Sequence, residues 1–322
     1  MRDAMAVAVV GDDGHDEDPT VSQLEKLFAE MVAKEAALFV PSGVMGNQIA
    51  LRVLTRPGDS VLVGARSHIV DFEMGASARN ASIQFATVDD ERGVLSPIEV
   101  MERIDAELDH APVIAAVVIE NTHMFAGGVP WSTSEIDELA GAAAGRPIHL
   151  DGARLFNASV ATGETLASLA ARATTVTCAL SKGLCAPVGS LFASDADTVS
   201  RARIERKRLG GAMRQAGFLA AAGIVALETM IERLADDHQR ARRLATVIAE
   251  RFPESEYDAA SCRTNIVAFN HPNARQIVAQ LGERGVLGET LAPQRARFVT
   301  HRDVSDDMID HACDVVTSLS LR

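Results

Sequence analysis

Aromatic residues are scarce in this chain of 322 residues, because they make up only 4% of it, with one tryptophan and one tyrosine. Hydrophobic residues nevertheless reach 47%. Alanine, valine and leucine must therefore fill most of the interior, as is common in proteins with a buried parallel sheet. The length allows one large domain together with a small one, and a sizeable core.

Basic residues are also few. The chain has 31 lysines and arginines against 44 acidic residues, so its formal net charge is -13. Nucleic acids and anionic membrane surfaces are bound by clustered Lys and Arg, so this balance argues against both kinds of partner. One basic cluster exists, at residues 201–208. Its pattern is equally typical of a solvated helix face and of an anionic site, and both interpretations stay open.

The four cysteines are far apart and form no CxxC pair, at Cys178, Cys185, Cys262 and Cys313. This disfavours a disulfide framework and a metal site. The longest apolar run, residues 218–227, is shorter than the roughly 20 residues that a membrane span needs. The N-terminus shows no basic segment followed by an apolar core and a cleavage site. We therefore expect a cytoplasmic protein.

Several common catalytic motifs are missing as well. The sequence has no GxSxG elbow, no Walker A lysine, no HExxH and no GxGxxG. Acidic residues at positions 12–18 have the composition of a hard-cation site, but we favour a solvated acidic turn before a helix that begins near Pro19.

Strand-like apolar runs alternate with helical patterns along the first 200 residues, which predicts βαβ units and a mostly parallel sheet. Seven strands are expected, at residues 37–40, 60–63, 83–88, 113–120, 148–151, 176–180 and 190–192. Amphipathic helices are expected at residues 20–33, 43–54 and 132–144.

A second unit follows a long helical pattern, which runs without a break from residue 212 to residue 250. Short strands are expected beyond it at residues 265–269 and 297–300, and helices at 274–283 and 306–318. We predict a large domain over residues 1–235 and a small α+β domain over residues 236–322.

Lys182 directly follows the strand-like run at residues 174–180, and Asp151 ends the previous apolar stretch. A lysine and an aspartate at the carboxyl ends of two buried strands suit pyridoxal phosphate. The amine can form a Schiff base with the cofactor's aldehyde, and the carboxylate can hold the ring nitrogen protonated, so that the ring accepts electrons. The pair therefore predicts a site for this cofactor.

A candidate phosphate site begins at Ser42 and Gly43, which follow a predicted strand and start a predicted helix. Free backbone N–H groups and the helix dipole attract anions there, although a plain N-cap is the alternative. Arg214, at the start of the long helical pattern, could reach a phosphate or lie on a helix face.

Two histidines and two arginines also follow or lie on predicted strands. His68 and His123 should lie at the carboxyl edge of the sheet, where an imidazole can stack on a cofactor or exchange protons. The alternatives are a surface-loop histidine for His68 and a structural role for His123. Arg154 could hold the cofactor's phenolate oxygen or a substrate carboxylate, or form a salt bridge with Asp151. Arg297, on a small-domain strand, could clamp a carboxylate across a cleft.

Taken together, these segments resemble the low-specificity L-threonine aldolases, pyridoxal-phosphate enzymes of the aspartate-aminotransferase-like fold. The resemblance follows the chain in order, and its segments are residues 11–21, 39–43, 120–123, 149–157, 181–184, 213–217 and 299–301. It implies an α/β fold: three αβα layers around a mostly parallel seven-stranded sheet, plus a small α+β C-terminal domain.

The resemblance also implies roles for individual residues. Cofactor-binding roles fall on Lys182 as the covalently joined lysine, Asp151 at the pyridine nitrogen, Arg154 beside the ring and His68 stacked on it. They also fall on Ser42, Gly43, Val44 and Arg214 near the phosphate, and on Lys207 near the cofactor. Substrate-binding roles fall on His123, Arg154 and Arg297. No metal is implied. Lys207 corresponds to a lysine often supplied across a subunit boundary, so we expect a homodimer or homotetramer with shared active sites.

The activity that the resemblance implies is retro-aldol cleavage of L-threonine, L-allo-threonine and related β-hydroxy-α-amino acids to glycine and an aldehyde. Lys182, Asp151, His68 and His123 are the expected catalytic residues, with either histidine as the base, acting through water. The alternatives are another pyridoxal-phosphate β-eliminating lyase or an amino-acid racemase.

The sequence departs from the family pattern in a few places. Relatives usually carry Thr, Asn and Gly where this chain has Val44, Met124 and Cys185. They also usually begin with a segment containing Arg-Ser-Asp-Thr, upstream of the stretch seen here at residues 1–5. A non-catalytic homologue, impaired by the lack of that segment, is therefore a further alternative.

Overall fold

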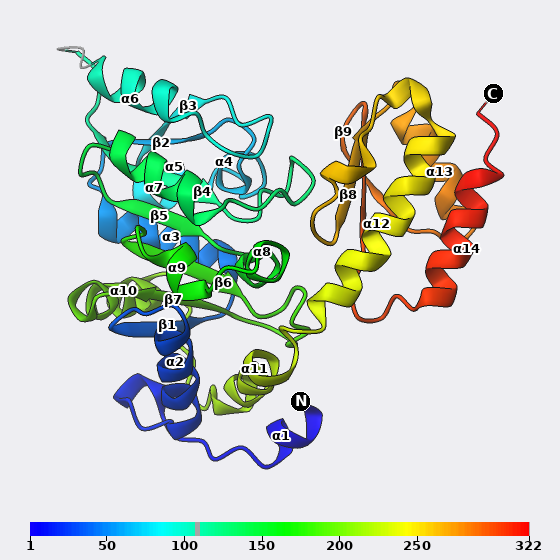
Figure 1. The fold of residues 1–322 in the computed structure, drawn as a ribbon. Helices are drawn as coiled ribbons and strands as arrows, with labels where there is room; N and C mark the ends of the chain where they lie inside the picture. Colours follow the sequence, from blue (N-terminus) through cyan, green and yellow to red (C-terminus); the bar gives the residue numbers. More distant parts are fainter. Residues whose placement is uncertain (107–109, 322) are drawn as a thin grey trace.

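The computed structural model describes residues 1–106 and 110–321, which build two sheets joined by a long helix (Figure 1). The larger sheet has seven strands in the order β1-β7-β6-β5-β4-β2-β3. Their bounds are β1 (Ala36–Val40), β2 (Ser60–Gly64), β3 (Gln84–Val88), β4 (Ile114–Glu120), β5 (Ile148–Asp151), β6 (Thr175–Ala179) and β7 (Ser190–Ser194). Each lies within two residues of its predicted bounds.

The pairing of this sheet is parallel except at β7, which runs antiparallel to both of its neighbours, β1 and β6. Strand β1 therefore points the same way as the rest of the sheet. The prediction of a mostly parallel seven-stranded sheet is confirmed. One consequence is that five strands end at the same edge of the sheet, with Val40, Gly64, Glu120, Asp151 and Ala179 as their last residues.

Both faces of this sheet are covered, because its strands are apolar on both sides. In β2, Leu62 packs into one buried cluster, whereas Val61 and Val63 pack into another on the opposite face. The cluster with Leu62 includes residues of α2 (Pro19–Met31), α6 (Pro97–Asp105), α7 (Thr133–Ala142), α8 (Leu155–Thr162), α9 (Leu166–Ala170) and α11 (Gly217–Thr229). The opposite face is covered by α3 (Gly43–Leu54), α4 (His68–Asp71), α5 (Ala76–Ala81) and α10 (Ala196–Arg208). The expected three-layer arrangement is confirmed.

The second unit contains the three-stranded antiparallel sheet β8-β10-β9. Its elements are β8 (Ile266–Asn270), β9 (Glu289–Ala292), β10 (Arg295–Val299), α12 (Leu234–Arg251), α13 (Ala274–Gly282) and α14 (Asp306–Thr317). They enclose a core of their own around Phe252, Phe269 and Ile277. The small α+β unit is confirmed, while the domain boundary at residue 235 stays a prediction that falls in the first turn of α12.

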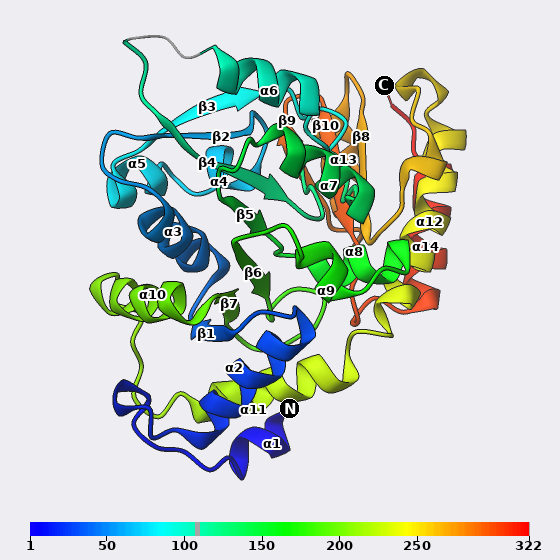
Figure 2. The same cartoon turned by 60° about the vertical axis from the view of Figure 1, so that its left-hand side comes forward.

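The continuous helix predicted over residues 212–250 is wrong. Helix α11 ends at Thr229 and α12 begins at Leu234. The break is hidden because the residues between, 230–233, include neither Gly nor Pro. The two helices also bury different surfaces: α11 lies against α2 and the short α1 (Arg2–Ala6), as Figure 2 shows for α2, whereas α12 packs on α14.

The acidic turn at residues 12–18 is not fully solvated, contrary to expectation. Asp13 is buried and pairs with Arg206 of α10 at 2.6 Å between Oδ2 and Nη2. Asp18 is buried too and caps α2, because its side chain accepts hydrogen bonds from the N–H groups of Thr20 and Val21. The basic cluster of α10 is thus partly a buried ion-pair face.

Among the helices of the described residues, none is both long and apolar enough to cross a bilayer.

Candidate active site

A hollow of about 190 Å³ lies where the carboxyl edge of the large sheet meets the small sheet. Its walls are formed by His68, Phe72, Met124, Arg154, Lys182, Glu289, Leu291 and Arg297. The first five follow β2, β4, β5 and β6, and the last three lie on β9 and β10. The structure therefore brings His68, Arg154, Lys182 and Arg297 together, as predicted, although they are far apart in the sequence.

Lys182 lies in the loop after β6, and its amine faces this hollow. Burial lowers the pKa of Lys182 to about 8, and the nearby charge of Arg154 acts in the same direction. Across the described part of the chain, its side chain has no hydrogen bond or ion pair. The amine is therefore unusually available as a neutral nucleophile near physiological pH.

The loop that carries Lys182 closes in a tight turn, in which the N–H of Cys185 donates to the carbonyl of Lys182 at 2.9 Å. Cys185 has a φ of 62°, in the left-handed region that glycine adopts most easily. Gly183 is crowded for a different reason, since a Cβ there would lie 2.7 Å from the end of the Leu234 side chain, which would have to shift. The departure from the family pattern at Cys185 therefore has a conformational cost.

Asp151 ends β5, next to the strand that precedes Lys182, and is almost fully buried. Its Oδ1 accepts from the N–H of Ala153 at 3.1 Å, and its Oδ2 accepts from the Nδ2 of Asn47 at 2.8 Å. No salt bridge joins it to Arg154 in the described structure. The carboxylate is thus fixed in place by uncharged donors.

Asn47, on α3, is the centre of this buried polar network. Its Nδ2 also donates to Glu73, and its Oδ1 accepts from Thr177 and lies 3.0 Å from the Nε2 of His149. Burial lowers the pKa of His149 to about 4, so the ring is neutral at pH 7. We therefore assign its proton to Nε2, where it is donated to Asn47.

His68 begins α4 and is half-buried rather than a surface-loop residue. Its backbone N–H donates to Glu120 Oε2 at 2.8 Å, and its ring Nδ1 lies 3.2 Å from Glu73 Oε1. Burial lowers the pKa of His68, but the hydrogen bond with Glu73 and the charges of Asp151 and Glu120 outweigh it, so the net pKa is raised. A nitrogen of His68 and one oxygen each of Glu73 and Asp151 lie within 4.8 Å of one another.

His123 is buried just outside the hollow and is engaged at both ring nitrogens. Its Nε2 lies 2.8 Å from Asp90 Oδ2, and its Nδ1 accepts from the N–H of Ala126 at 3.2 Å. Burial lowers the pKa of His123, but the hydrogen bond with Asp90 and the charges of Glu120 and Asp90 together outweigh it, so the net pKa is raised. Its predicted contact with the substrate hydroxyl stays a prediction. Its neighbour Met124, rather than His123, reaches the wall of the hollow.

The arginines give the hollow an excess of positive charge. Burial lowers the pKa of Arg154, whose guanidinium makes no hydrogen bond or ion pair with any described residue. Burial and Arg154 together lower the pKa of Arg297 to about 10. Arg297 pairs with Glu289, but its buried Nε has no hydrogen-bond partner in the described structure. Together with Lys182 these groups form a site for an anion.

The predicted phosphate-binding residues Ser42, Gly43 and Val44 lie outside this hollow, at the N-terminus of α3. Ser42 is the N-cap, since its Oγ accepts from the N–H of Met45 at 3.2 Å, and Gly43 and Val44 form the first turn. Gly211 packs closely on Met45, which brings the segment of Arg214 to this helix end. Arg214 is exposed and paired with Asp12, and Lys207 is exposed near the end of α10.

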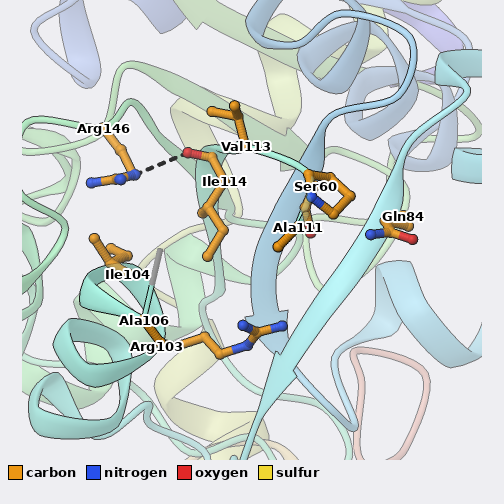
Figure 3. A pocket seen from close by; sticks show the side chains of 10 residues that line it. Ser60, Gln84, Arg103, Ile104, Ala106, Ala111, Val113, Ile114 and Arg146 are labelled. Carbon is orange, nitrogen blue, oxygen red and sulfur yellow. Dashed lines mark hydrogen bonds between the residues drawn. The ribbon is translucent and has the colours of Figure 1, made fainter. Parts of the chain in front are cut away.

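Other pockets are larger but lie elsewhere. One of about 340 Å³, shown in Figure 3, is lined by Ser60, Gln84 and Ile114, which begin β2, β3 and β4. It therefore opens at the amino edge of the sheet, opposite the charged hollow. In Figure 3 the guanidinium of Arg146 donates to the carbonyl of Ile114, at 2.9 Å. Among the described residues of its lining, no group resembles the lysine–aspartate pair.

Two residues of the network, Asn47 and Glu73, were missed by sequence reasoning. The available signal was weak: Asn47 and Gln48 are adjacent polar residues within a predicted helix whose neighbours are apolar. Glu73 lies in an irregular segment between α4 and α5, where an acidic residue is usually solvated. Only the packing of α3 against β5 and β6 reveals their positions.

Comparisons of sequence identify the family, and a comparison of structures supports the fold. The family model described as "Beta-eliminating lyase" matches residues 1–270. The chain is 38% identical to the probable low-specificity L-threonine aldolase 2 of Arabidopsis thaliana, over 97% of this chain and 90% of the relative. It is 37% identical to the low specificity L-threonine aldolase of Escherichia coli (strain K12), over 96% of this chain and 92% of the relative. The solved structure of Leishmania major threonine aldolase has a similar fold, with a TM-score of 0.81 at 19% identity, covering 98% of this chain and 94% of that one.

Proposed function

The chain belongs to the β-eliminating lyase family, and from this membership we propose that it is a pyridoxal-phosphate-dependent aldolase of the low-specificity L-threonine type. It cleaves L-threonine, L-allo-threonine and related β-hydroxy-α-amino acids to glycine and an aldehyde. The observation that carries this proposal is the position of Lys182, whose unpaired amine faces a charged hollow beside the buried Asp151. The two relatives described above are themselves named low-specificity L-threonine aldolases.

The residues present fit pyridoxal phosphate. The hollow combines the amine of Lys182, the unpaired guanidinium of Arg154 and the orphaned Nε of Arg297. Each of these groups gains a partner if an anionic cofactor or substrate enters. Lys182 would hold the cofactor covalently, Asp151 would face its ring nitrogen, and His68 would stack on the ring.

Bound pyridoxal phosphate supplies an aldehyde that joins the substrate's amino group, and a protonated ring that takes up the electron pair when the Cα–Cβ bond breaks. Asp151 favours that protonated ring because it is a buried carboxylate held by uncharged donors. The pKa of Lys182, lowered to about 8, leaves a useful fraction of neutral amine at physiological pH. Lys182 is also well placed to take and return protons near the substrate.

Binding of the amino acid relies on the two arginines. Arg297 reaches the hollow from β10 of the small unit, and Arg154 reaches it from the loop after β5. Planar guanidinium groups suit a carboxylate, so we assign the substrate carboxylate to Arg297 with support from Arg154. The hydroxyl proton is then accepted by His68, which faces the hollow, whereas His123 is held by Asp90 and Ala126.

Completion of the phosphate site involves a second subunit in this proposal. Lys207 and Arg214 are exposed, and the segment of Arg214 lies near the N-terminus of α3, which Ser42, Gly43 and Val44 form. Exposed cations close to a helix N-terminus suit a phosphate held between protomers. A homodimer or homotetramer in the cytoplasm is therefore part of the proposal, as is the division into domains at residue 235.

The test is to incubate the holoenzyme with L-threonine and to measure glycine and acetaldehyde. Both products should form in equal amounts. A β-elimination would instead release ammonia and 2-oxobutanoate, and a racemase would give the opposite configuration at Cα. Lys182→Ala should abolish turnover and the visible absorbance of the cofactor, whereas Lys26→Ala, an exposed lysine of α2, should leave both unchanged. Full activity in Lys182→Ala would disprove the proposal.

A further inference from the structure

Glu73 is a buried carboxylate that the proposed chemistry does not yet use. Its side chain is inaccessible to solvent, although it lies in the irregular segment between α4 and α5. It accepts hydrogen bonds from the amides of Asn47 and Gln48, each at 2.8 Å, and lies 3.2 Å from the Nδ1 of His68. A carboxylate suits this position, because its two oxygens act only as acceptors and N–H groups surround it.

This arrangement fixes the tautomer of His68. As a carboxylate Glu73 only accepts, so we assign the ring proton of neutral His68 to Nδ1. The other ring nitrogen, Nε2, then carries a lone pair, and it has no hydrogen-bond partner among the described residues. His68 lines the hollow beside Lys182, so this lone pair is the ring's available proton acceptor.

We propose that Glu73 is a positioning residue for the retro-aldol reaction: it orients His68 through Nδ1, so that Nε2 accepts the hydroxyl proton of the substrate. The amide of Asn47 donates both to Glu73 and to Asp151. Asn47 therefore links the carboxylate that faces His68 and the carboxylate that would face the cofactor into one rigid unit. During cleavage the O–H bond of the substrate breaks, its proton passes to Nε2, and the O–H electron pair forms the carbonyl of the departing aldehyde. The electron pair of the broken Cα–Cβ bond would be taken up by the ring of the bound cofactor. This inference rests on the proposed aldolase function.

The charges around His68 determine the direction of the pH dependence. Glu73, Asp151 and Glu120 face it from the segment after α4, from β5 and from β4, and all three stabilise the protonated ring. Lys182, in the loop after β6, opposes them. The pKa of His68 is raised, and a base works only when deprotonated. Activity must therefore rise with pH through the pKa of His68, and the loss of a neighbouring negative charge must move this rise to lower pH.

Glu73→Gln removes the charge while preserving the packing. A Gln side chain can turn its oxygen to Asn47 and His68 and its amide to Gln48. Gln48 can accommodate this by flipping its own amide, because its Oε1 is buried without a partner in the described structure. The flip leaves its oxygen facing the hydroxyl of Ser77, which can donate to it. The variant thus separates the effect of charge from that of lost packing.

The decisive experiment is the pH profile of kcat/KM for L-threonine with the holoenzyme. In Glu73→Gln the acidic limb should move to lower pH, with a plateau close to that of the unmodified enzyme. Glu73→Ala, which removes the acceptor, should lower the plateau about tenfold because the ring loses its orientation. Glu25→Gln is a matched control, since Glu25 is a buried carboxylate of α2 bonded to Phe39 and Arg203 outside the hollow. It should leave the limb in place.

A double substitution shows whether Glu73 acts through His68. In a His68→Phe background, Glu73→Gln should produce no further change in the pH profile. If Glu73→Gln does not fold, Glu73→Asp replaces it: the shorter carboxylate is withdrawn from Nδ1, and the limb should move in the same direction. An unmoved limb in an active, folded variant, or an equal shift in the His68→Phe background, would overturn the inference. Absence of glycine formation by the unmodified enzyme would instead refute the proposed function.

Discussion

Asn47→Leu should destabilise the protein more than any other single exchange of an asparagine for an apolar residue of similar size. Asn47 forms four hydrogen bonds to four different residues, with Glu73, Asp151, His149 and Thr177 as partners. Leucine fills the same space but can neither donate nor accept. The substitution therefore tests whether the polar network, rather than packing, holds α3 against β5 and β6.

The cost can be worked out group by group. The Nε2–H of His149 and the hydroxyl of Thr177 are buried and lose their acceptor, at roughly 1–3 kcal/mol each. Glu73 and Asp151 each lose one donor but keep others. The added apolar burial of leucine offsets part of this, which leaves a net loss of about 4 kcal/mol. For a chain of 322 residues the unfolding entropy is about 0.7 kcal/mol per kelvin, so Tm should fall by about 6 °C.

Thermal unfolding of the cofactor-free protein, followed by circular dichroism, measures this change. Asn273→Leu is the matched control, because Asn273 is exposed and its side chain does not cap α13. It should change Tm by less than about 1 °C, as surface exchanges usually do. The reasoning is refuted if Asn47→Leu lowers Tm no further than Asn273→Leu does.

Three more predictions follow from single features. Cys185→Gly should stabilise the chain by about 0.5–1 kcal/mol. Glycine relieves the strain of the left-handed φ of 62°, and this gain exceeds the entropy that glycine adds to the unfolded chain. Cys313→Gly, within α14, should instead cost about 1 kcal/mol in the same melting assay. Uptake of pyridoxal phosphate by the apoenzyme should accelerate with rising pH around a midpoint of about 8, because the amine of Lys182 reacts only when deprotonated and burial lowers its pKa; stopped-flow absorbance showing a midpoint near the ordinary lysine pKa would contradict this. Arg206→Met should cost about 3–5 kcal/mol because it leaves the buried Asp13 without its cation, and adding Asp13→Leu should restore much of the lost Tm; a double variant as unstable as the single one would count against it.

The positions of strands and of the residues that follow them were predictable from sequence for a physical reason. Strands of a parallel sheet end at a common edge, so Asp151 and Lys182 had to lie near each other once both were placed after buried strands. The alternation of apolar runs with helical patterns likewise predicted a sheet with helices on both faces. The edge strand β9 was missed because its residues are only half-buried or exposed and show no apolar run.

Contacts that depend on partners distant in the sequence were beyond prediction. The break between α11 and α12 leaves no mark in composition, because both segments favour helix and only their packing differs. The engagement of His123 by Asp90 joins residues at the ends of β4 and β3, which no local pattern connects. The buried Arg206 was equally hidden within a basic run of α10. In each case the missing information is three-dimensional pairing, not residue type.

The walls of the charged hollow come from two separate sheets, and this has a mechanical consequence. A molecule that binds Lys182 on one side and Arg297 on the other adds a further connection between the two units. Occupancy of the hollow should then restrict motion between the two units. A protease should therefore cleave the connecting segment more slowly in the filled enzyme than in the empty one.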